Sequence, residues 1–152
     1  MAQLRQVLLL EEALTLAPRL DRATAERARE FQDEPVPEGV VRDFLFARFD
    51  DPETLLLVAE TEDGRADLGL CLIGPFVDPL LPTRVPMVLL LHVERDARHR
   101  GLARALVEEA TRLLAERGYA TLAARAGHND DALISMGERW GFVRHWELML
   151  RE

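Results

Sequence analysis

A nearly unbroken apolar run, VPMVLLLHV at residues 85–93, limits the possible folds of this chain more than any other feature. A run without polar alternation is typical of a strand that is covered on both faces. The next segment has helical spacing, with a single apolar stripe made of Ala103, Leu106, Val107, Ala110, Leu113 and Leu114. Gly118 is expected to end this helix, and YATLAAR at 119–125 is expected to form a strand. Together these segments predict a right-handed parallel crossover.

The N-terminal part predicts a strand, two helices and a hairpin. We expect the strand at about residues 4–10, followed by a helix that Thr15 caps and that has Pro18 in its first turn. A second helix is expected at about 37–49, with an inward apolar face of Val40, Val41, Phe44, Leu45 and Phe49. TLLLVAE and LGLCLIGPF flank the turn signal Asp63-Gly64, which predicts an antiparallel hairpin.

The C-terminal part predicts a short helix and a last strand. Asn129 or Asp130 is expected to cap the helix, and Gly141 to end it. FVRHWELML at 142–150 is expected to form the final strand or a tight hairpin. The predicted fold class is therefore α/β (α+β), in one domain over residues 1–152: a mixed, mostly antiparallel sheet with one parallel crossover and flanking helices.

Composition excludes some classes of function. Nineteen Lys and Arg against twenty-seven Asp and Glu give a net charge of −8, which disfavours non-specific nucleic-acid binding. No apolar run approaches the roughly 20 residues that span a bilayer, and the N-terminus has no secretory apolar segment. We therefore expect a cytoplasmic protein that binds neither membrane nor nucleic acid. Cys71, the only cysteine, lies in the apolar run LGLCLI and is interpreted as a core residue.

Positive charge gathers where the central helix begins, at Arg98, His99, Arg100 and Arg104. A helix start offers unpaired backbone N–H groups and a partial positive charge, which suit a phosphate or pyrophosphate. Gly101 lets an anion approach the backbone. The alternative is a solvated loop that binds nothing. The sequence has neither a G-x-G-x-x-G motif after a strand nor a Walker-type lysine loop.

The segment VERDARHRGLARAL resembles the motif V-x-P-x-x-R-x-x-G-x-G/A of the GNAT superfamily, the acetyl-CoA-dependent N-acetyltransferases. Val93, Arg98, Gly101 and Ala103 match the motif, and Arg95 replaces a common proline. HNDDALISMGERWGF, downstream, is similar to the second conserved segment of that superfamily, and the predicted order of strands and helices also agrees.

The resemblance implies a site for acetyl-CoA as co-substrate. Leu91 and Val93 would offer backbone hydrogen bonds to the pantetheine arm, and Asn129 would lie near the same arm. The coenzyme pyrophosphate would be held by the main-chain amides of Arg98, His99, Arg100, Gly101, Leu102, Ala103 and Arg104.

The usual catalytic acid is missing from this chain. Members of the superfamily often have a tyrosine four residues before the Gly-Phe pair, and here that position is Gly137. Ser135 is a possible substitute, whereas Tyr119, the only tyrosine, is expected to lie far from the departing thiolate. For both we prefer a structural role, so the catalytic residues are unknown.

The base is equally undefined, because Met87 and Leu89 occupy the positions where some relatives have a glutamate or histidine. His92 is interpreted as a packed or surface residue, since neighbouring residues of a strand face opposite sides. His128, Asp130 and Asp131 are interpreted as turn and capping residues, and no metal is expected.

These observations favour an N-acetyltransferase that acts by direct attack of a small-molecule or protein amine. A homodimer is a hypothesis for its assembly. A second hypothesis is an acyl-CoA-binding or sensing module without catalysis. A third is a structural or dimerisation domain whose RHRG segment binds nothing specific.

Overall fold

The computed structural model describes residues 2–31, 34, 36–64, 67–77, 80, 84–126, 130–145, 149 and 151. Within these residues five strands form one sheet in the order β1-β2-β3-β4-β5. The pairs are antiparallel except for β4 and β5, which are parallel. The strands are β1 (Ala2–Gln6), β2 (Leu55–Thr61), β3 (Asp67–Val77), β4 (Arg84–Val93) and β5 (Ala123–Ala124).

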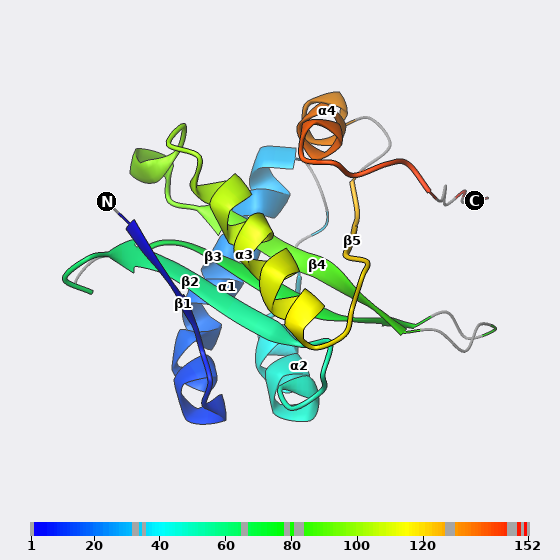
Figure 1. The fold of residues 1–152 in the computed structure, drawn as a ribbon. Coiled ribbons are helices and arrows are strands. Elements are labelled where there is room, and N and C mark those ends of the chain that lie inside the picture. Colours follow the sequence, from blue (N-terminus) through cyan, green and yellow to red (C-terminus); the bar gives the residue numbers. More distant parts are fainter. Residues whose placement is uncertain are drawn as a thin grey trace.

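Helices cover both faces of the sheet (Figure 1). They are α1 (Leu10–Phe31), α2 (Val40–Arg48), α3 (Leu102–Glu116) and α4 (Asp131–Arg139), with a 3₁₀ turn η1 (Arg95–Ala97) before α3. One core cluster joins α1 and α2 to residues of β2, β3 and β4 that include Leu56, Leu72 and Leu90. The other joins Leu106, Ala110 and Leu114 of α3 to the opposite face of the same strands.

A bulge interrupts β4 in the middle of the sheet. Leu72 of β3 faces Leu90, but the next residue of β3, Ile73, faces Val88, so Leu89 is the extra residue. Leu89 and Leu90 consequently both belong to the cluster under α1 and α2, whereas Val88 belongs to the cluster under α3. The bulge therefore changes which side of the sheet the following residues face.

The predicted parallel crossover is confirmed, because β4, α3 and β5 follow one another and β4 pairs with β5 in parallel. The predicted hairpin of β2 and β3 and the fold class are also confirmed. Gly118 ends α3 with φ 94°, and the N–H of Tyr119 donates to the carbonyl of Leu114 at 2.9 Å, as a left-handed helix end requires.

The predicted N-terminal boundaries were wrong. β1 covers 2–6 rather than 4–10, and α1 begins at Leu10. Glu11 and Glu12 are more favourable at the positive end of a helix than they would be in a strand. Thr15 is therefore not a cap; it lies inside α1 and its hydroxyl donates to the carbonyl of Glu12. Val40 was predicted to face inward, but it is 46% exposed because α2 starts there, one residue after Gly39.

The predicted strand at 119–125 was too long. Only Ala123 and Ala124 pair with β4, because the bulge at Leu89 ends the common register. Asp130 caps α4 and accepts the N–H of Leu133 at 3.1 Å, whereas Asn129 lies outside the described residues. Residues 142–145 form no strand, and most of the remaining segment predicted as a final strand lies outside the described part. No helix in the described ranges is long and apolar enough to span a membrane.

Candidate functional site

The start of α3 presents a row of open backbone amides. Gly101 is its N-cap with φ 77°, and His99 also has a positive φ of 66°. The first backbone bond of the helix runs from Ala105 to the carbonyl of Gly101. Among the described residues, the backbone N–H groups of residues 99–104 donate no backbone hydrogen bond. These N–H groups point along the helix start and are available to an anion.

The charge at this helix start is positive. The first turn of α3 contains no acidic residue, and no side chain caps it. His99 and Arg100 are exposed, and Arg100 forms no ion pair with any described residue. Gly101 has no atom within 4 Å of the place where a Cβ would stand, so the approach to the amides is open. The geometry suits a phosphate-bearing ligand.

The side chain of Arg98 bonds to other parts of the protein instead of facing the helix start. Its Nε donates to the carbonyl of Val93 at 2.9 Å, and its Nη1 donates to Glu30 at 3.2 Å. Its Nη2 also lies 3.5 Å from Glu26. These two acidic partners were not predicted from the sequence, although their spacing of four on α1 places them on one helix face. Arg98 therefore fastens the loop to β4 and α1 while His99 and Arg100 remain outside.

No described strand pairs with the part of β4 that lies beside this loop. The N–H of Glu94 donates to the carbonyl of Leu68, which makes these two residues a hydrogen-bonded pair of the antiparallel ladder. Such pairs alternate along the strand, so Leu91 and Val93 direct their backbone groups away from β3 and toward the side of β5. β5 pairs with β4 only at Met87 and Val88. Among the described residues, no strand pairs with the backbone of Leu91 or the N–H of Val93 on this side, while the carbonyl of Val93 accepts from Arg98.

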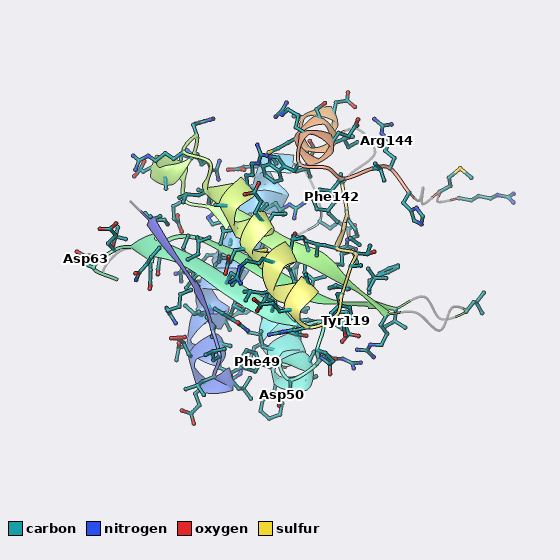
Figure 2. All side chains as sticks on the ribbon, in the orientation of Figure 1. Phe49, Asp50, Asp63, Tyr119, Phe142 and Arg144 are labelled. Atoms are coloured by element: carbon teal, nitrogen blue, oxygen red, sulfur yellow. The ribbon has the colours of Figure 1, made fainter. Side chains whose placement is uncertain are left out.

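The positions considered for an acid lie on α4 and after α3. Gly137 of α4 has room for a side chain, since an added Cβ would meet only the Cβ of Phe142 at 3.8 Å. Ser135 is exposed on the same helix. Figure 2 shows Tyr119 at the end of α3 remote from the helix start. Burial and the neighbouring carboxylate of Glu53 raise the pKa of Tyr119, so its phenol stays protonated at neutral pH.

The positions considered for a base are apolar and packed. Met87 is buried. Leu89 and Phe44 of α2 both pack against Gly74, because a Cβ added to Gly74 would lie 2.7 Å from Leu89 and 2.4 Å from the ring of Phe44. His92 is buried, as expected of a packed residue, at 7% exposure. The side predicted for His92 from strand alternation was wrong, because the bulge places His92 on the same side as Leu89, facing α1. Among the described residues no group of three or more His, Cys, Asp or Glu could hold a metal.

Replacing Gly137 by alanine is expected to stabilise the protein by about 0.5–1 kcal/mol, since glycine inside a helix costs about that much relative to alanine. The free space next to Phe142 accommodates the methyl group. Chemical denaturation of Gly137→Ala and wild type measures the difference. A loss of stability would show that α4 and the following turn are packed more tightly than described.

The fold and the site share three features: a mixed sheet, a bulged strand that splays from its parallel neighbour, and an open helix start beside that strand. The acetyltransferase (GNAT) family model matches residues 18–142. The chain therefore belongs to the GNAT acetyltransferase family. No curated protein matches the chain.

Solved structures agree with this fold over the whole chain. A GCN5-related N-acetyltransferase from Ralstonia eutropha is 22% identical, with a TM-score of 0.76, and the match covers 100% of this chain and 99% of that one. An aminoglycoside 6'-N-acetyltransferase in complex with a CoA bisubstrate analogue is 13% identical, with a TM-score of 0.72 and coverage of 100% and 97%. A predicted acetyltransferase with acetyl-CoA from Clostridium acetobutylicum is 14% identical, with a TM-score of 0.70 and coverage of 100% and 96%. Acetyl-CoA, the expected co-substrate, is thus consistent with the family and with these structures.

Proposed function

We propose that this chain is an N-acetyltransferase that transfers the acetyl group of acetyl-CoA to an amine. The observation that carries the proposal is the row of open amides from His99 to Arg104, which begins beside the edge of β4 that no described strand pairs. A phosphate group at the amides and an extended arm along the strand edge together match the two ends of a coenzyme A molecule.

The residues present fit such a co-substrate. The amides of residues 99–104 and the charges of His99 and Arg100 would hold the pyrophosphate, and Arg98 would keep the loop in place through Val93. The backbone of Leu91 would bond the pantetheine arm. A contribution of Asn129, which lies outside the described residues, stays a prediction.

The chemistry is direct attack. The amine nitrogen bonds to the carbonyl carbon of the thioester, the carbon–sulfur bond breaks, and the amine proton is lost while the thiolate gains one. Met87, Leu89 and Gly137, at the positions where relatives place acid or base groups, have no group that transfers a proton. Holding the two reactants together can by itself supply a large part of the rate, on the order of 7–11 kcal/mol for well-oriented reactants. A neutral amine is the reactive form.

The acceptor is proposed to bind on the α1 and α2 side of the sheet, near the bulge. Phe44 and Leu89 give that region an apolar wall, and the net charge of −8 favours a cationic amine in solution. Similar solved structures include an aminoglycoside 6'-N-acetyltransferase and a ribosomal-protein-alanine N-acetyltransferase, so both small-molecule and protein acceptors occur on this fold. The cytoplasmic location and a homodimer stay predictions.

Binding is tested first, by isothermal titration and thermal shift with acetyl-CoA. A ligand of the folded state raises the melting temperature by mass action. Absence of binding at about 1 mM, the weak end of the usual affinity range, would contradict both the enzyme and the sensing hypothesis and leave a structural role.

Transfer is then tested by release of coenzyme A thiol in the presence of a panel of amines. Burial raises the pKa of Cys71 to about 12, so the protein thiol should not react with the detecting disulfide reagent. Binding without thiol release for any amine would favour the acyl-CoA-sensing module instead.

Replacement of Tyr119 by phenylalanine is expected to leave kcat/KM within a few-fold of wild type. The hydroxyl lies beside Glu53 and remote from the start of α3, whereas loss of a true general acid costs about 10²–10⁴-fold. Steady-state kinetics of Tyr119→Phe and Ser135→Ala measures how much each hydroxyl contributes to kcat/KM. A hundredfold loss in a folded Tyr119→Phe protein would place the reaction at the other end of α3, and such a loss in Ser135→Ala would assign the proton to Ser135.

A further inference from the structure

A cavity of about 280 Å³ lies between α1 and the end of β4, on the side of the sheet away from α3. We call it the arginine cavity, and the residues of its wall that matter here are Arg19, Arg22, Glu26, Arg29, His92 and Glu94. Four of them are spaced by three or four residues on α1, so they form one stripe of that helix.

Arg19 is buried without satisfying its hydrogen-bond donors. Its side chain is only 11% exposed, and neither Nη1 nor Nη2 has a hydrogen-bond partner among the described residues. The carboxylates of Asp67 and Glu94 lie 3.4 and 3.7 Å away, which is longer than the roughly 2.7–2.9 Å of a charged hydrogen bond. Buried donors without partners are costly and rare, so a partner of another kind is expected.

The arginines at the mouth of the cavity favour an anion as that partner. Asp67 lies 3.4 Å from Arg19, outside the wall, and the wall itself contains three arginines and two carboxylates. Both carboxylates already lie near other cations or His92: Glu26 is 3.5 Å from Arg98, and Glu94 is 3.7 Å from both Arg19 and His92. Arg22 and Arg29 form no ion pair within the described ranges. Their donors are therefore available at the mouth of the cavity.

We propose that the arginine cavity binds a small oxyanion, a carboxylate or a phosphate, through Arg19, Arg22 and Arg29. Arg19 supplies the buried pair of donors, and the planar guanidinium matches two oxygens of either anion. Arg22 and Arg29 add charge from the exposed side. The site lies behind β4, separate from the open amides at the start of α3, and the proposal does not depend on acetyl transfer.

The test uses inorganic phosphate and acetate as probes on the full chain carrying Gly101→Asp, which is expected to weaken anion binding at the start of α3. Isothermal titration and amide NMR are expected to show saturable binding with shifts at Ala23 and His92, which lie in the cavity wall. Binding of both probes would identify a general oxyanion site, and binding of phosphate alone would identify a tetrahedral one.

Two further variants locate the site. Arg22→Gln with Arg29→Gln keeps the buried core intact and is expected to weaken binding about tenfold or more, because both charged hydrogen-bond donors at the mouth are lost. Arg42→Gln with Arg139→Gln removes the same charge elsewhere and should leave binding unchanged. Equal loss in both double variants, or no saturable binding of either probe, would overturn the proposal and leave a cavity filled by water.

Discussion

Gly101→Asp is expected to weaken binding of acetyl-CoA about a hundredfold or more while the protein remains folded. The new carboxylate would stand among the open amides from His99 to Arg104 and repel the phosphates, and like charges in close contact cost several kcal/mol. The fold should tolerate the change. Gly101 has φ 77°, which aspartate adopts more readily than most residues, and no atom lies within 4 Å of the added Cβ. Isothermal titration measures the affinity.

Gly101→Asn is the matched control, because asparagine has the same shape and tolerance for positive φ but no charge. It is expected to lose much less affinity than the aspartate variant. Arg98→Ala should also lose less, since the backbone amides remain. Equal affinities of Gly101→Asp and wild type would place the coenzyme elsewhere on the protein.

Leu106→Ala is expected to lower the free energy of unfolding by about 2–5 kcal/mol. Leu106 is a fully buried member of the cluster that joins α3 to the sheet, and the packing of that helix sets the direction of its open start. A domain of this kind is stable by only about 5–15 kcal/mol, so the loss is a large part of the total. Denaturation in urea measures it.

The control is Leu8→Ala, in which the same atoms are removed from a side chain that is 72% exposed. Its effect should stay within about 0.5 kcal/mol, as for most surface substitutions. If both variants lost the same stability, α3 would not be packed on the sheet as described.

The sequence could predict the elements whose pattern is strong. The apolar run of β4 and the stripe of α3 predicted both elements and their parallel crossover, and Gly118 predicted where α3 ends. These features are local: burial on two faces, helical spacing and a left-handed helix end each depend on a few neighbouring residues.

The errors arose where tertiary contacts decide. The bulge at Leu89 has no signal in a run of leucines, and it shortened β5 and turned His92 toward α1. The start of α1 was missed because Leu8 and Leu9 continued the apolar pattern of the strand, although both are exposed. A single pattern cannot show which apolar residues another element will cover.

In the candidate site, too, local features could be predicted from the sequence and contacts between distant residues could not. The motif from Val93 to Ala103 predicted a helix start with open amides, because backbone geometry follows from the glycine and the helix boundary. The two carboxylate partners of Arg98 could not be predicted from the motif, since Glu26 and Glu30 are about 70 residues away in the chain. Arg19 and its cavity depend on the same packing of α1 against the end of β4.

An amide NMR titration of the isotopically labelled protein with coenzyme A tests most directly whether the start of α3 holds the coenzyme. We expect saturable shifts concentrated on the amides of residues 99–104 and of Leu91, with little change at Tyr119 at the far end of α3. Shifts concentrated elsewhere, or no binding at about 1 mM, would show that the coenzyme does not bind there.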